Sequence, residues 1–164
     1  MTEPRTITDL QEAVSLLEFV DVIVYESRGQ RRDGGFDDLL EDSTNDQGNG
    51  ELRMDLLVQD GPEGLALRAQ CVTSSRDVVV KYDAAAVYRK AEPMVLDAAT
   101  ASAFITSSAL MTLYPFLREG VHEVSARLGF PIKLGLLKRG ETGVQLNNVQ
   151  PSSNEVNAVL ASHE

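Results

Sequence analysis

Residues 97–129 read DAATASAFITSSALMTLYPFLREGVHEVSARLG, and this stretch decides the fold. Its apolar side chains recur every three or four residues, which predicts an amphipathic helix. These positions are Leu110, Leu113, Leu117, Val121, Val124 and Leu128. Asp97 is a suitable N-cap, and Gly129 is a suitable C-terminal stop. Pro115 lacks a backbone N–H, so we expect the helix to kink or split nearby.

Upstream of this helix, four runs alternate apolar and polar residues, as is typical of half-buried strands. The runs are 17–28, 51–59, 65–74 and 77–89. The last three are joined by short connections, which favour an antiparallel sheet with one covered face. Strands followed by a long amphipathic helix predict an α+β fold with the helix against the sheet.

The remaining segments set the expected domain limits. Residues 1–16 are polar with a weak helical pattern, and we expect a flexible lead-in. Residues 29–50 are rich in Gly, Asp and Asn, which predicts a mobile loop. We place one domain at 17–137, its last residues 132–137 being a short extended apolar piece. The segment 138–164 is expected to be a polar tail with a short helix.

Charge and composition exclude several classes of protein. The chain has 164 residues, 43% of them apolar, which suffices for one domain with a core. With 25 acidic and 15 basic side chains the net charge is −10, which repels phosphate backbones and disfavours nucleic-acid partners. No stretch approaches the ~20 apolar residues of a membrane span, and the N-terminus lacks a signal-peptide pattern. We therefore expect a cytoplasmic protein without membrane insertion.

The sequence offers no catalytic, metal or cofactor site. Cys71 is the single cysteine, so it cannot form an internal disulfide, and its place within a strand indicates a structural role. Glu119 and His122 form half of a carboxylate-bridged metal motif, but no second copy exists. Nucleophile-elbow and phosphate-loop patterns are missing as well. We therefore predict that the protein is not an enzyme and needs no cofactor.

Apolar side chains occur on both faces of the predicted strands, although one helix can cover only one face. In the first strand, Val20, Val22 and Val24 are expected to point one way, and Phe19, Ile23 and Tyr25 the other. Either a second protomer covers the remaining surface, or it binds apolar ligands or chains.

Nine residues of the helix and its end resemble the signature of the SecB family of export chaperones. That family carries the run [LF]-[FY]-P-[YF]-x-R-E in its main helix and then R-G-x-F-P where the helix ends. The matching residues here are Tyr114, Pro115, Phe116, Arg118, Glu119, Arg127, Gly129, Phe130 and Pro131.

The resemblance implies a fold and a function. The fold is a four-stranded antiparallel Greek-key sheet with the long, Pro-kinked helix alongside and a short C-terminal helix, assembled as a dimer of dimers. The function is an ATP-independent holdase, which keeps unfolded preproteins in hydrophobic grooves and delivers them to the translocase motor SecA. Some SecB-like members instead serve one antitoxin of a toxin–antitoxin system. A purely self-assembling interaction protein is a further alternative.

The SecA-contacting surface departs from the family pattern. The family's first strand ends in Asp-Ile-Ser-Phe-Glu, where this chain has Val22-Ile23-Val24-Tyr25-Glu26. Glu26 is therefore the candidate SecA contact, while the first acid is replaced by Val22. A further acid expected in the last strand falls near Lys81.

The resemblance and the apolar pattern together suggest two sets of site residues. The candidates for the client groove are Phe19, Val24, Val87, Tyr88, Phe104, Met111 and Tyr114. Tyr114 is equally explained as a core residue at the Pro115 kink. The candidates for contacts between protomers are Val20, Val22, Ile105 and Leu117.

Overall fold

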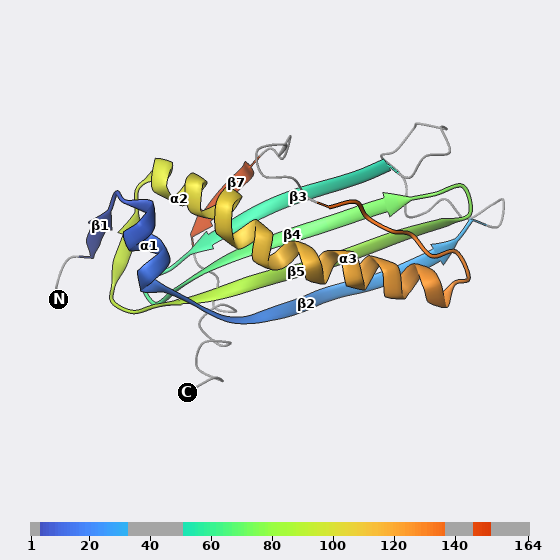
Figure 1. Ribbon diagram of the computed structural model, residues 1–164, viewed down its shortest axis with the longest axis horizontal. Helices are drawn as coiled ribbons and strands as arrows, with labels where there is room; N and C mark the ends of the chain where they lie inside the picture. Colours follow the sequence, from blue (N-terminus) through green and yellow to red (C-terminus); the bar gives the residue numbers. More distant parts are fainter. Residues whose placement is uncertain (1–3, 33–50, 137–145, 152–164) are drawn as a thin grey trace.

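A five-stranded sheet forms the centre of the computed structural model, which describes residues 4–32, 51–136 and 146–151 (Figure 1). The strands lie in the order β2 (Leu17–Arg31), β5 (Val78–Lys90), β4 (Gly64–Ser74), β3 (Glu51–Asp60) and β7 (Leu146–Pro151). Strands β2 to β5 are antiparallel, and the first of them pairs with the last. This is a Greek key, so the predicted α+β fold and its four strands are confirmed.

Strand β7 was not predicted. It pairs in parallel with β3, and it falls in the segment that we expected to be a polar tail. An edge strand needs backbone partners more than apolar alternation, so its sequence carries only a weak strand signal. The expected C-terminal helix and most of the expected loop 29–50 lie outside the described residues.

The predicted helix consists of three segments on one face of the sheet: α2 (Ala98–Phe104), the π-helix η1 (Ile105–Ala109) and α3 (Leu110–Arg127) (Figure 1). Both predicted ends are confirmed. The Asp97 carboxylate accepts a hydrogen bond of 2.7 Å from the Thr100 N–H, and Gly129 ends the helix with φ +88°.

The irregular turn of the helix lies upstream of Pro115, contrary to our expectation. Helix α3 continues through Pro115, whereas the Leu110 N–H donates to the carbonyl of Ile105 in a wider π turn. The hydroxyls of Thr106 and Ser107 donate to carbonyls one turn back, at distances between 2.6 and 3.3 Å. Such side-chain bonds compete with the backbone ladder, which explains why the helix widens here.

Two glycines let α3 lie directly on the sheet. A Cβ atom on Gly120 would lie 2.1 Å from the Tyr82 ring, and one on Gly29 would lie 2.5 Å from the Val124 side chain. These separations are too short for any other residue without a shift of the helix. Glycine at these two positions therefore allows α3 to lie this close to β5 and β2.

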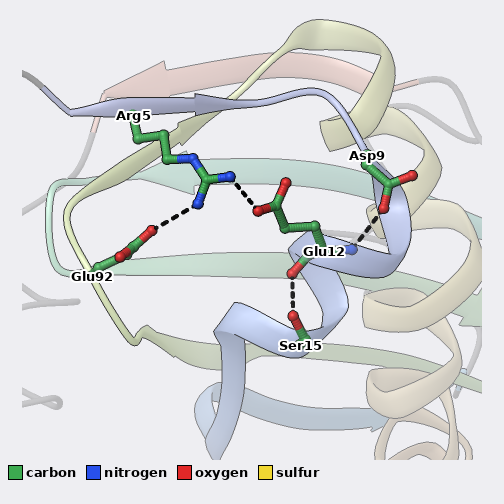
Figure 2. Close-up of polar contacts among 5 residues, drawn as sticks. All are labelled: Arg5, Asp9, Glu12, Ser15 and Glu92. Carbon is green, nitrogen blue, oxygen red and sulfur yellow. Dashed lines mark hydrogen bonds and ion pairs between the residues drawn. The ribbon is translucent and has the colours of Figure 1, made fainter.

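Residues 5–16 are folded, so the prediction of a flexible lead-in is wrong for them. They form β1 (Arg5–Ile7), parallel to β6 (Met94–Leu96), and α1 (Leu10–Leu16). Figure 2 shows the Arg5 guanidinium between Glu12, at 2.5 Å, and Glu92, at 3.4 Å, and the Asp9 carboxylate capping α1. Ile7 and Ala13 are fully buried in the core. The sequence did not predict this, because the segment is mostly polar and only these two apolar side chains are fully buried.

Two irregularities in β2 change which side chains share a face. The register with β5 shifts between Phe19 and Asp21 and again between Val24 and Glu26. Val22 packs against the core under the helix, whereas Val20 and Ile23 pack against Ala66 and Val87 on the opposite face. The expected alternation is therefore wrong, since each bulge adds one residue and reverses the sides. We call the side covered by α3 the helix face and the other side the far face.

Candidate functional site: the apolar edge beside the helix

Two predicted groove residues are exposed on the outermost strand. Phe19 is 42% exposed and Val24 is 48% exposed, and they pair with Tyr88 and Ala84 of the core. Both therefore lie on the helix face of β2. Among the described residues, no strand pairs with the outer side of β2. Apolar side chains thus lie along a strand edge that no other described strand covers, a combination that favours contact with another polypeptide.

The other groove candidates lie deeper. Met111 is partly buried, and four candidates are buried in the chain's own interior. These four are Val87, Tyr88, Phe104 and Tyr114. Val87 also lies on the far face, with Ala66. The structure therefore does not bring all seven candidates into one open groove, because the alternation of residues cannot reveal how much surface the helix covers.

An aromatic stack connects the exposed edge with the core. The ring of Phe19 lies 5.8 Å from Tyr88, and the ring of Tyr88 lies 5.2 Å from Phe104, both in edge-to-face geometry. The Tyr88 hydroxyl is buried without a hydrogen-bond partner within 3.5 Å among the described residues. Burial raises the pKa of Tyr88, and the nearby Thr112 side chain offsets part of this. The stack gives Phe19 a rigid support at the surface.

Residues 130–136, which we call the strap, return along α3 after the helix ends (Figure 1). The Tyr114 hydroxyl donates to the Gly135 carbonyl at 2.8 Å, and Arg118 Nε donates to the Leu134 carbonyl at 3.1 Å. His122 Nδ1 lies 3.3 Å from the Ile132 carbonyl oxygen. Tyr114 is thus a core residue with a polar tip, one of the two roles considered above.

The strap explains why the two parts of the family motif occur together. Tyr114 and Arg118 of the first part hold the backbone that follows Gly129, Phe130 and Pro131 of the second part. The Phe130 ring lies under the guanidinium of Arg31, 5.0 Å from its carbon to the ring centroid, and fixes the turn to the end of β2. Sequence reasoning identified the motif but not this connection, which needs the fold.

Glu26, the SecA candidate, forms an ion pair with Lys81 at 2.8 Å on the far face. Lys81 occupies the position near which the family pattern has an acid. The negative charge of Glu26 is therefore balanced inside the chain. Both side chains are about one-third exposed, so the pair remains at the surface.

Next to this pair, the far face holds a partly buried ion pair that the sequence did not predict. Arg68 binds both carboxylate oxygens of Asp83 at 2.8 Å, and Gln70 donates to the same carboxylate at 3.3 Å. The Arg68 guanidinium also stacks on Tyr25, 4.1 Å from the ring centroid. Alternating strand positions in the sequence gave no signal for it, because its members come from three strands.

The four candidates for contacts between protomers differ in accessibility. Val20 and Val22 are partly buried. Ile105 and Leu117 are fully buried inside the chain and offer almost no surface for direct contacts between protomers. Phe116, 46% exposed, is the large apolar side chain of the motif that α3 presents to solvent. Helical periodicity identifies the apolar face, which here faces the sheet.

Other chemistry finds no support in the described part of the chain. Cys71 is buried, which raises the pKa of its thiol to about 12 and agrees with the predicted structural role. No three His, Cys, Asp or Glu side chains come together as metal ligands within the described residues. None of the helices described is both long and apolar enough to cross a membrane.

A Greek-key sheet beneath a helix that carries the Tyr-Pro-Phe-x-Arg-Glu run is the arrangement that the resemblance to the SecB family implies. No protein-family model matches the chain. The chain is 29% identical over 152 residues to the SecB-like chaperone SmegB of Mycolicibacterium smegmatis, covering 92% of this chain and 94% of SmegB.

A solved structure agrees in fold. The Mycobacterium tuberculosis SecB-like chaperone Rv1957, in complex with a ChAD peptide from the Rv1956 HigA1 antitoxin, superposes with a TM-score of 0.60. The match covers 78% of this chain and 92% of that one, at 15% identity. Together the two similarities support a SecB-like family for this chain. These similarities support a chaperone role.

Proposed function

We propose that the protein is an ATP-independent holdase that binds non-native polypeptides at the apolar edge formed by β2 and the helix face. The observation that carries the proposal is the exposure of Phe19 and Val24 on an outermost strand. An extended client gains apolar contacts with these two side chains. Several such weak sites along one client add avidity without tight local fit.

The direct test is suppression of aggregation of a chemically denatured reporter enzyme, without nucleotide. We expect suppression by the wild type at equimolar protein. The double variant Phe19→Ser/Val24→Ser should lose most of it. Val95→Ser is the matched control, because Val95 is 42% exposed but lies on β6, in a separate small sheet. Equal activity of all three proteins would refute the apolar edge as the client site.

We propose a homotetramer, built as a dimer of dimers, in which the outer side of β2 pairs between protomers and the outward side of α3 packs between dimers. Val24→Asp and Phe116→Asp change exposed side chains and should lower the sedimentation coefficient without unfolding the protein. A monomeric wild type at micromolar concentration would contradict the assembly. Pairing through β2 and client binding at its edge share residues, so we expect the grooves at the seams between protomers.

The second candidate is a dedicated chaperone of an antitoxin, and its support is the antitoxin peptide in the complex of the SecB-like chaperone Rv1957. The first candidate, general export, requires SecA. Glu26→Lys should weaken SecA binding if Glu26 contacts SecA, although its ion pair with Lys81 reduces the charge that it offers. Affinity for SecA and for an antitoxin C-terminal peptide, measured side by side, distinguishes the two candidates.

A further inference from the structure

Side chains of α3 hold the strap, whereas backbone hydrogen bonds to neighbouring strands hold each strand of the sheet. One face of α3 presents Tyr114, Arg118, His122 and Ser125, spaced by four, four and three residues along the helix. The first three face carbonyl oxygens of the strap, and the Ile132 N–H donates to Ser125 Oγ at 2.8 Å. Among the described residues, no backbone–backbone hydrogen bond joins 131–136 to the rest of the chain. The side chains of α3 therefore hold the strap by its backbone.

From residue 130 to residue 135, the side chains of the strap alternate between the core and solvent. Ile132 is partly buried against the core and Leu134 is buried, whereas Lys133 and Gly135 between them are exposed. The last residue, Leu136, is 78% exposed. We define the seat as the four α3 side chains together with the core surface under Ile132 and Leu134. The seat binds a backbone by hydrogen bonds and accommodates every second side chain of the bound segment.

These two properties are those of a binding site for extended polypeptide. Hydrogen bonds to backbone carbonyls do not depend on the sequence of the bound segment, and the apolar positions select only for alternate apolar side chains. A segment without ladder hydrogen bonds is also among the parts of a fold that open most readily. The seat therefore combines tolerance of sequence with an occupant that can leave.

We infer that the strap is a stand-in for client, and that an extended segment with apolar residues at every second position displaces it from the seat. This inference rests on the proposed function and names the class of client for a second site, beside the apolar edge of β2. The strap competes at the high effective concentration of a tethered segment, so a client binds only the open fraction of molecules.

Hydrogen exchange of the wild-type protein tests the displacement without any substitution. The probe is the synthetic peptide FPIKLGL, the sequence of the strap itself, and the control peptide FPSKSGL lacks the two inward-facing apolar side chains. Saturating FPIKLGL should raise the exchange rate of the strap amides about tenfold, to the extent that it holds the strap open. The control peptide should leave the rate unchanged. Amides in the middle of α3 report that the fold is intact.

A pair of variants tests the competition. Leu134→Ser weakens the strap, and we expect it to lower the apparent Kd for the denatured reporter and for FPIKLGL by about tenfold, because the open fraction grows. Leu136→Ser makes the same change at an exposed position of the same segment and should leave both values unchanged.

The outcomes separate this inference from the proposed function. A wild type that binds the reporter while FPIKLGL leaves strap exchange unchanged or slower overturns the inference and leaves the holdase proposal intact. Weaker binding by a folded Leu134→Ser protein also overturns it, since the strap would then be part of the client site. Failure of both proteins to bind any reporter refutes the proposed function, and the inference with it.

Discussion

The two faces of the sheet are stabilised by different forces. On the helix face, α2, α3 and the strap cover a continuous apolar cluster that extends from Ile7 to Leu134. On the far face, the apolar cluster consists of Ala66 and Val87 with two partly buried neighbours, and a partly buried ion pair lies beside it. Burial of apolar area is nearly independent of salt, whereas ion pairs are weakened by it.

The comparison indicates a division of tasks between the faces. The helix face supplies most of the folding free energy and, at its edge, the apolar side chains proposed for clients. The far face carries paired charges whose geometry suits one strand register only, so the pairs of Arg68 with Asp83 and of Glu26 with Lys81 fix how β2, β4 and β5 align.

The largest effect is expected in the core of the helix face. Phe104→Ala removes a fully packed ring from the aromatic stack and should lower the free energy of unfolding by about 3–5 kcal/mol in urea denaturation. Phe116→Ala is the matched control on α3, where the ring is 46% exposed, and should stay within about 0.5 kcal/mol. Equal losses would show that the stack carries little of the folding energy.

A smaller effect is expected on the far face. Asp83→Asn keeps the shape of the side chain but removes the carboxylate charge that faces Arg68, which should cost about 1–3 kcal/mol. Because Arg68 is 30% exposed, we expect a loss of stability in the lower part of this range. High salt screens the two charges and should make this loss smaller still. Asp55→Asn, which breaks the exposed pair with Arg53, is the control and should change stability by less than about 0.5 kcal/mol. A salt-independent loss would argue against a Coulombic contribution.

Cys71 lies in the core, and its effect is confined to alkaline pH. The thiol pKa is about 12 in the folded protein against 9.0 for the free group, so ionisation favours the unfolded state. The stability that the protonated thiol contributes is fully present below pH 9 and is lost as the pH rises towards 12. Denaturation of wild type and Cys71→Val between pH 8 and 11 measures it: only the wild type should lose this contribution. At pH 8 a thiol reagent should modify the protein only after denaturation.

The smallest effect is expected at the cap of α2. Hydrogen bonds from Thr100 lower the pKa of Asp97, so its carboxylate stabilises the fold above the pKa of the unfolded chain. Asp97→Ala should be slightly less stable at pH 7. The difference from wild type should vanish as the pH falls through the lowered pKa of Asp97. A difference that persists in acid would mean that the cap acts without its charge.

The sequence predicted what depends on periodicity and local chemistry. The four strands, the helix with its Asp97 cap and the Gly129 stop follow from such signals, and the motif around Pro115 indicates the family. The bulges in β2, the pairing of Arg68 with Asp83 and the return of the strap depend on residues distant in sequence. The close approach of α3 to the sheet at Gly120, beside Tyr82, likewise cannot be seen in any single stretch of sequence.

The pairing of β2 with β5 has a consequence for how the chain is made. Strands β3, β4 and β5 follow one another through short turns. Strand β2 instead pairs with β5, which places Leu17 beside Lys90, far along the sequence. Loop closure over that separation is slow compared with hairpin formation, so we expect β2 to dock late. During synthesis the apolar strand leaves the ribosome unpaired, in the extended form proposed for clients. A nascent copy of this chain would thus itself be a candidate client for finished copies.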